Sequence, residues 1–131
     1  MRALAVLALL VGCGSSSQSL CKSDSDCGGD VCARNGECTA ASNIRMVKVT
    51  WTVRGQQASA TTCAPAPSLE LYFYSTEDTF GYEPVPCMEG QFTIDKIPLR
   101  YDQVELDRQG GSPVGYSPIG PSSTVMFDLQ L

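Results

Sequence analysis

The stretch VKVTWTV, residues 47–53, decides the fold class. Valine or tryptophan occupies every odd position of this stretch, and lysine or threonine every even position. Alternation with a period of two, in β-branched and aromatic residues, is typical of a strand with one buried face. The stretch therefore predicts a β-strand whose Trp51 is buried against Leu71, Phe73 or Phe127 of a facing sheet.

A second strand is expected over residues 69–74, where Leu69, Leu71 and Phe73 alternate with Glu70, Tyr72 and Tyr74. The other expected strands lie near residues 82–88, 92–94, 104–106, 114–116 and 125–131. Pro84 and Pro86 would confine residues 82–88 to a sheet edge, because proline has no N–H for a ladder. About seven short strands and no convincing helix predict an all-β fold, a small antiparallel β-sandwich over residues 43–131.

The segment GQFTIDKIPLRYDQVEL, residues 90–106, resembles a repeat of transthyretin-like and carboxypeptidase-regulatory-like domains. In that repeat a strand leads through a proline and a tyrosine to the next strand. The resemblance implies that Pro98 and Tyr101 form the corner between two strands, although Leu99 and Arg100 depart from the usual Pro/Gly-rich pattern. The expected sandwich is thus transthyretin-like or immunoglobulin-like.

The first residues are typical of an export signal. Arg2 is followed by an apolar run from Ala3 to Val11, which is far shorter than the roughly 20 residues that a membrane span needs. Residues 10–13, LVGC, resemble the bacterial lipobox. The resemblance implies a signal peptide over residues 1–12 and a lipid-bearing Cys13. The alternative is an ordinary secretory signal with a cysteine near its cleavage site.

Residues 13–20 are then expected to form the lipid anchor and a Gly/Ser-rich tether. Several acyl chains hold a protein at a membrane almost permanently. Gly14 stands where the inner-membrane retention signal has aspartate, so the outer membrane is the expected location.

Removing Cys13 from the seven cysteines leaves six, an even number that indicates disulfides in an exported chain. Cys63 and Cys87 are expected to pair within the sandwich. The other four, Cys21, Cys27, Cys32 and Cys38, lie in residues 21–42, which are too poor in apolar side chains to form a core. Three pairings are open, and we favour Cys21 with Cys32 and Cys27 with Cys38.

This Cys-rich microdomain is similar, over Leu20 to Thr39, to short repeats that follow the lipobox in many bacterial surface lipoproteins. Asp24, Asp26 and Asp30 within it are weak calcium candidates, since calcium prefers several carboxylate oxygens on a tight loop. Gly28 stands at the third ligand position of an EF-hand and no glutamate closes the loop. A solvated acidic turn is therefore the preferred interpretation.

Several kinds of chemistry have little support in the sequence. The chain has no histidine and no GxSxG or CxxC motif, which argues against the common serine-hydrolase and zinc sites. Its net charge of −5 makes nucleic acid an improbable partner. Paired carboxylates drawn from Glu70, Glu83, Glu89, Asp95, Asp102 and Asp107 are conceivable, but no enzyme activity and no cofactor are expected.

Aromatic residues give the best candidate for a binding site. Tyr72 and Tyr74 should share one sheet face, and Phe80 and Tyr82 follow in the next loop. These residues either cover a second hydrophobic layer, the preferred interpretation, or form a patch for a protein or a sugar. The expected function is that of a non-catalytic envelope or cell-surface lipoprotein. It would bind or scaffold an envelope protein, for example as an accessory to an adhesion or motility assembly. The alternative is a carbohydrate-binding module that recognises glycans through the tyrosines.

Overall fold

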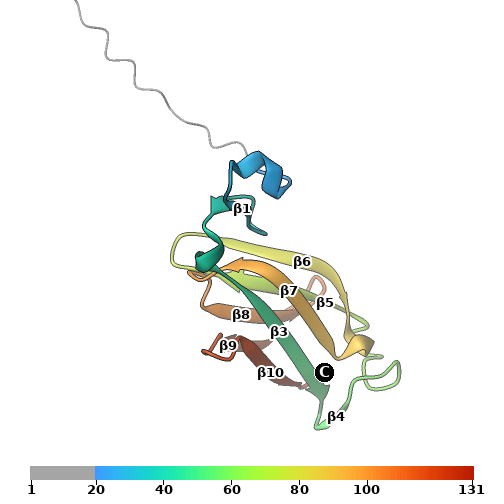
Figure 1. Ribbon diagram of the computed structural model, residues 1–131. Coiled ribbons are helices and arrows are strands. Elements are labelled where there is room, and N and C mark those ends of the chain that lie inside the picture. Colours follow the sequence, from blue (N-terminus) through green and yellow to red (C-terminus); the bar gives the residue numbers. More distant parts are fainter. Residues whose placement is uncertain (1–19) are drawn as a thin grey trace, which may run out of the picture.

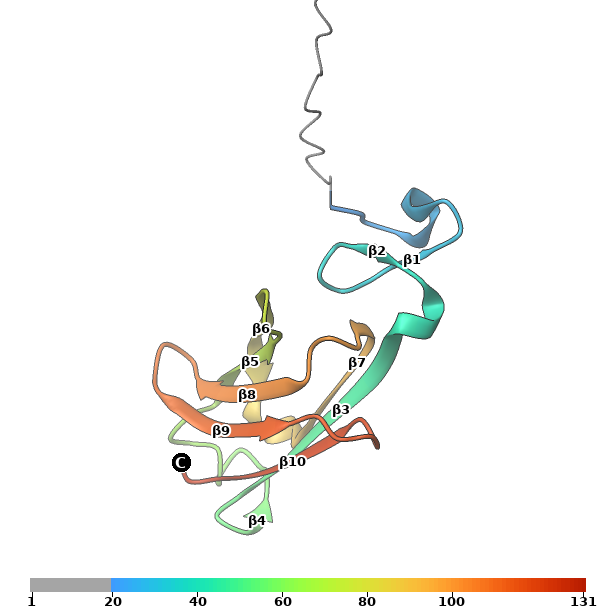
Figure 2. The same cartoon turned by 90° about the vertical axis from the view of Figure 1, so that its left-hand side faces the viewer.

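The computed structural model describes residues 20–131, so the LVGC segment, with the predicted lipidation site Cys13, lies outside the described residues. The microdomain contains a 3-10 turn η1 (Asp24–Cys27), strand β1 (Val31–Cys32) and strand β2 (Cys38–Thr39). A second 3-10 turn, η2 (Ala41–Asn43), leads into the β-sandwich. Figures 1 and 2 show the microdomain at one end of the sandwich and the C-terminus toward the other end. From Leu20 onward, no helix is long and apolar enough to cross a membrane.

The sandwich confirms all seven predicted strands, with shifted bounds. They are β3 (Ile44–Val53), β5 (Ser68–Tyr74), β6 (Thr79–Pro86), β7 (Gln91–Pro98), β8 (Gln103–Arg108), β9 (Pro113–Pro118) and β10 (Thr124–Leu129). A short strand β4 (Gln56–Gln57) and a 3-10 turn η3 (Cys87–Glu89) were not predicted.

The strands form two packed sheets (Figure 2). In one sheet β3 lies between β7 and β10 and also pairs with β4, and the other has the order β6-β5-β8-β9. Strand β6 is at an edge, as its prolines predict. The expectation of a wholly antiparallel sandwich is wrong at one pair, because β10 runs parallel to β3. The chain crosses from one sheet to the other between β9 and β10, so no hairpin sets the direction of β10.

The core confirms the predicted inward face of β3. Trp51 is 4% exposed, and Leu71 and Phe73 of the facing sheet are fully buried. Phe127 lies elsewhere than expected, since it pairs with Trp51 in the neighbouring strand of the same sheet. Sequence alternation fixes which face a side chain takes, but not the sheet to which its strand belongs.

The three expected disulfides are present, and they include the interleaved pairing in the microdomain. Cys21 is bonded to Cys32 and Cys27 to Cys38, each across 11 residues. Cys63 and Cys87, 24 residues apart, are both buried in the sandwich core. The third disulfide therefore joins the β4–β5 connection to the turn that follows β6.

Pro98 and Tyr101 lie at the corner between β7 and β8. The Tyr101 N–H donates to the Pro98 carbonyl oxygen at 3.1 Å, and the Tyr101 ring is completely buried. Its hydroxyl donates to Asp78 Oδ2 at 2.5 Å, which ties the corner to the β5–β6 hairpin. Asn35 Nδ2 of the microdomain donates to the same hydroxyl at 3.2 Å.

A β-bulge in β7 positions the microdomain. Asp95 and Lys96 together lie opposite Met46 of β3, and Lys96 has a left-handed φ of 55°. Because a bulge re-aims side chains, these neighbours both reach the microdomain. Asp95 pairs with Arg34, and Lys96 Nζ lies 2.8 Å from Asp24 Oδ1.

Candidate binding surface

The four candidate aromatic residues do not form one patch. Strand β5 buries Leu71 and Phe73 and leaves Tyr72 and Tyr74 half-buried on its outer face. Phe80 and Tyr82 belong to strand β6 rather than to a loop, and Phe80 pairs with the inward-facing Phe73. The predicted grouping is therefore wrong, because the register of β6 turns its aromatic residues toward the core.

Phe80 and Tyr82 cover the hydrophobic core at the open edge of the sandwich. The Phe80 ring stacks on Phe73 with centroids 5.2 Å apart and meets Tyr101 edge-on at 4.7 Å. The Tyr82 ring lies 5.5 Å from that of Phe92 on β7, across the space between the two sheets. For these two residues, packing in a hydrophobic layer is the correct interpretation.

The outer face carries a different set, which we call the tyrosine–carboxylate face. It consists of Glu70, Tyr72 and Tyr74 on β5, Glu105 and Asp107 on β8, and Tyr116 on β9. Cross-strand pairing aligns Tyr72 with Glu105 and Tyr116 in one row, and Glu70 with Asp107 in the next. The sheet register therefore assembles residues from three strands on one side.

The tyrosine hydroxyls of β5 are held by carboxylates. Tyr72 donates to Glu70 Oε2 at 3.0 Å, and Tyr74 donates to Glu105 Oε1 at 3.0 Å. Burial and the Glu105 contact raise the pKa of Tyr74 to about 12, so its hydroxyl remains a donor. Tyr116 has its ring centroid 6.5 Å from that of Tyr74 and is 57% exposed. Two rings are thus fixed in place beside a third that faces solvent.

Asp107 is the buried acid of this face. It is only 9% exposed, and its Oδ1 has no hydrogen-bond partner among residues 20–131. Burial, followed by the nearby charges of Glu105 and Glu70, raises the pKa of its carboxyl group to about 6. In contrast, the pKa of Glu70 is lowered, mainly because the Gly110 N–H donates to its carboxylate. The pKa values of these two cross-strand neighbours are therefore shifted in opposite directions.

The four strands of this sheet are strongly acidic. They contain Glu70, Glu83, Glu105 and Asp107, but only one basic residue, Arg108 at the end of β8. Arg108 pairs with the inward-facing Leu69, and its guanidinium donates to the Gln130 carbonyl oxygen at 3.3 Å. Consequently no lysine or arginine of these strands shares the outer face with the carboxylates.

Sequence reasoning found part of this face. The sequence indicates Tyr72, Tyr74, Glu70 and Asp107 as candidates, but it does not single out Glu105 or Tyr116. Alternation in residues 103–107 places Glu105 and Asp107 on one face, yet nothing local reveals that this face continues that of Tyr72. Other considered carboxylates lie elsewhere: Glu89 is in η3, Asp95 pairs with Arg34, and Asp102 is in the β7–β8 corner.

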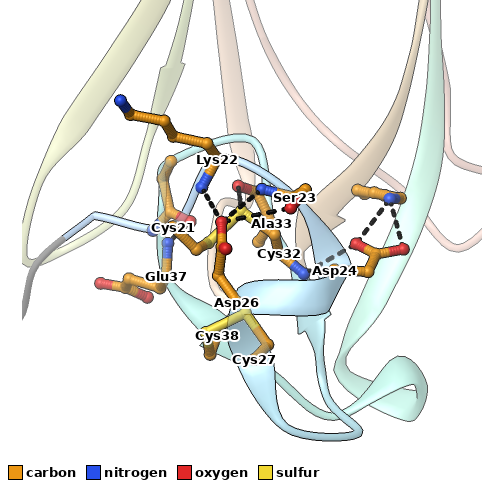
Figure 3. Close-up of a disulfide and its surroundings, with 12 residues drawn as sticks. Cys21, Lys22, Ser23, Asp24, Asp26, Cys27, Cys32, Ala33, Glu37 and Cys38 are labelled. Carbon is orange, nitrogen blue, oxygen red and sulfur yellow. Dashed lines mark hydrogen bonds and ion pairs between the residues drawn. A yellow bond between two sulfur atoms is a disulfide. The ribbon is translucent and has the colours of Figure 1, made fainter.

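Two of the three calcium candidates in the microdomain, Asp24 and Asp26, accept hydrogen bonds from protein donors (Figure 3). Asp24 accepts from Lys96 and from the Cys32 N–H, which lower its pKa, and Asp26 Oδ2 accepts the N–H groups of Lys22 and Ser23. In the described part of the chain, no three carboxylates bring oxygen atoms within 4.8 Å of one another. The sulfur atoms of Cys21, Cys27 and Cys32 do meet that distance, but as disulfide sulfurs they are not thiolate ligands.

Comparison with protein-family models, with curated proteins and with solved structures gave no match to this chain. The tyrosine–carboxylate face is therefore interpreted from its own chemistry.

Proposed function

We propose that this protein is a non-catalytic envelope lipoprotein that binds a protein partner through the tyrosine–carboxylate face. The observation that carries the proposal is a pair of hydrogen bonds from tyrosine hydroxyls to carboxylates, which fix Tyr72 and Tyr74 beside the exposed Tyr116. Tyrosine combines apolar area with a polar tip and is enriched at interfaces. Fixing the rings in advance lowers the entropy that a partner must overcome.

The anchoring part of the proposal rests on LVGC at residues 10–13, with lipid on Cys13 and the outer membrane as location. Leu20, seven residues further on, enters the microdomain rather than the sandwich. The ion pairs of Asp24, Arg34 and Glu37 and the hydrogen bond from Asn35 to Tyr101 join the microdomain to the sandwich. Such an arrangement favours a scaffolding role, in which a lipid-tethered base presents a fixed binding face, as in an accessory component of an adhesion or motility assembly.

A photo-crosslinking amino acid at position 116, in cells that produce the lipidated protein, tests this function. Position 126 on β10 is the matched control, since Met126 is 78% exposed on the other sheet. We expect a discrete crosslinked protein from position 116 and none from position 126. The same unspecific products from both positions would contradict binding at this face.

A carbohydrate-binding module is the second candidate. Its support is the placement of carboxylate oxygens, which accept hydrogen bonds from sugar hydroxyls, next to the rings of Tyr72 and Tyr74. A glycan array probed with the detergent-solubilised protein tests it. Binding to a glycan that is lost in Tyr116→Ala, without a protein crosslink, would favour this second function.

A further inference from the structure

The charge of the tyrosine–carboxylate face is uncompensated within residues 20–131. Cations near the microdomain are already paired, because Arg34, Lys96 and Arg100 each form an ion pair with a carboxylate. On the outer face, the carboxylates of Glu70, Glu105 and Asp107 have no cation from their own sheet. Complementary charge on a partner would therefore strengthen and orient its binding.

The state of Asp107 is a second and independent indication of a ligand. A buried carboxylate oxygen normally accepts a hydrogen bond, and leaving it without one costs about 1–3 kcal/mol or more when the group is charged. Asp107 Oδ1 has no donor in the described chain, and the side chains nearest in register, Glu70 and Glu105, are acids. A positive charge placed on the surface beside this carboxyl group would favour its charged form.

The geometry favours a guanidinium group over a metal ion. Calcium needs six to eight oxygens at about 2.3–2.6 Å, so its ligand atoms lie within about 5 Å of one another. No three described carboxylates meet this condition, and two of the acids are held by Tyr72 and Tyr74. A guanidinium is a planar fork with five donors that also stacks on aromatic rings, and Tyr116 offers an exposed ring. A neutral sugar would leave the repulsion between the acids uncompensated.

We propose that the tyrosine–carboxylate face binds an arginine-bearing basic segment of the protein partner, with the guanidinium between the carboxylates of β8 and the ring of Tyr116. This inference rests on the proposed function, because it names the chemistry of the partner that this function requires. It assigns Glu105 and Asp107 as charge-pairing residues and Tyr116 as the stacking residue.

Binding of a cation should depend on pH through Asp107. The titratable groups that face it are Glu70, Tyr72 and Tyr74 on β5 and Glu105 on its own strand. The pKa of Asp107 is about 6, so its carboxyl group is mostly neutral at pH 5 and mostly charged at pH 7.5. A ligand that requires the charged form should lose up to about tenfold in affinity at pH 5.

Titration of the full-length, detergent-solubilised protein with a short peptide of alternating arginine and glycine tests the inference. Amide chemical shifts, recorded at 150 mM salt, measure the affinity and locate the site even when binding is weak. We expect shifts on β5, β8 and β9, and at least about fivefold weaker binding in Glu105→Gln and in Asp107→Asn. Glu89→Gln removes the same charge from an exposed turn outside the face and should leave the affinity unchanged.

Two further probes separate the alternatives. A citrulline peptide of equal size should not bind, and equal binding of citrulline and arginine peptides would overturn the charge argument. Saturable binding of calcium alone at these amides would overturn it in favour of a metal site. If position 116 crosslinks a protein while the arginine peptide causes no shift, this inference fails and the proposed function stands. If the peptide binds as described but no protein crosslinks, the proposed function fails instead.

Discussion

The indole N–H of Trp51 donates a hydrogen bond to the carbonyl oxygen of Cys87 at 2.8 Å. The largest side chain of the core is therefore tied to one half of the sandwich disulfide. Cys87 begins the turn between β6 and β7. This hydrogen bond therefore links the centre of one sheet to the turn through which the chain leaves the other sheet. Both polar and apolar parts of Trp51 are thus satisfied in the core.

Replacing Trp51 should strongly destabilise the sandwich. We expect Trp51→Ala to lower the free energy of unfolding by about 3–5 kcal/mol, since it leaves a large cavity. Trp51→Phe keeps much of the volume, but leaves the Cys87 carbonyl oxygen without its donor, and should cost less. Urea denaturation measures both, and Lys48→Ala on the exposed face of β3 is the control. Native fluorescence emission at the solvent-exposed wavelength would contradict the burial of Trp51.

Removal of the sandwich disulfide should also lower stability. The Cys63–Cys87 bond closes a loop of 24 residues, and a double substitution to alanine should cost about 2–5 kcal/mol. The cost arises mainly because the unfolded chain gains freedom. Thermal unfolding of the variant and the oxidised protein gives the difference, and mass spectrometry without reduction should find neither cysteine alkylated. Alkylation of both would show that the bond is absent.

Asp107 should destabilise the folded protein at neutral pH. Its folded pKa of about 6 lies above the unfolded value of about 3.9, so the folded state keeps a proton that the unfolded state loses between these values. The stability that this residue contributes is fully present below pH 4 and is lost as the pH rises through 6. The free energy of unfolding of Asp107→Asn, taken relative to that of the native protein, should therefore rise by about 2 kcal/mol between pH 4 and pH 7.5.

Denaturation of both proteins at several pH values gives this difference directly. Carboxylates with lowered pKa values, such as Asp24 and Asp78, stabilise the folded protein less as the pH falls. Both proteins contain them, so their contributions cancel in the difference between the two unfolding free energies. A difference between the two proteins that does not change with pH would contradict the buried position of Asp107.

Arg100 should hold the microdomain against the sandwich. Its guanidinium donates to both carboxylate oxygens of Glu37, at 2.6 and 2.8 Å, and this contact lowers the pKa of Glu37. Arg100→Ala should weaken docking by about 1–2 kcal/mol, discounted because the pair is partly exposed. The Arg34 N–H, which donates to the Lys96 carbonyl oxygen at 3.0 Å, should then exchange with solvent faster. Lys22→Ala, whose side chain makes no ion pair in residues 20–131, should leave this exchange unchanged.

Lipidation should depend on Cys13. We expect Cys13→Ser to abolish palmitate labelling and either to release the protein from the membrane or to leave its signal uncleaved. Labelling and cell fractionation measure the two effects. Retained label in the variant would show that another residue carries the lipid, or that the chain is anchored differently.

Local patterns predicted the strands, because alternation in segments such as 47–53 and 69–74 reflects one buried face. They also favoured the disulfide pairing that the structure has, since interleaved bonds cross-link the turns at Gly28-Gly29 and Asn35-Gly36. Register and sheet membership could not be read in the same way. The inward direction of Phe80 follows from its pairing with Phe73, and the placement of Phe127 follows from a crossover between sheets.

Because strand register cannot be read from local sequence, only part of the candidate site was predicted. Glu105 and Asp107 lie some thirty residues from Tyr72 and Tyr74, and only the pairing of β5 with β8 places them together. The Asp95–Lys96 bulge was likewise invisible, because Lys96 adopts a left-handed backbone conformation that lysine rarely takes. Contacts with the microdomain hold Lys96 in place, through its ion pair with Asp24 and the hydrogen bond that its carbonyl oxygen accepts from the Arg34 N–H.

The irregular edge strands β6 and β7 affect whether neighbouring copies of this protein can pair through their sheet edges. Molecules tethered in one lipid layer, as we propose, meet at high local density, and a regular free edge would recruit the same edge of a neighbour and begin polymerisation. Pro84 and Pro86 remove two N–H donors from β6, and the Asp95–Lys96 bulge interrupts β7. We therefore expect these two edges not to pair with the same edges of a neighbouring copy.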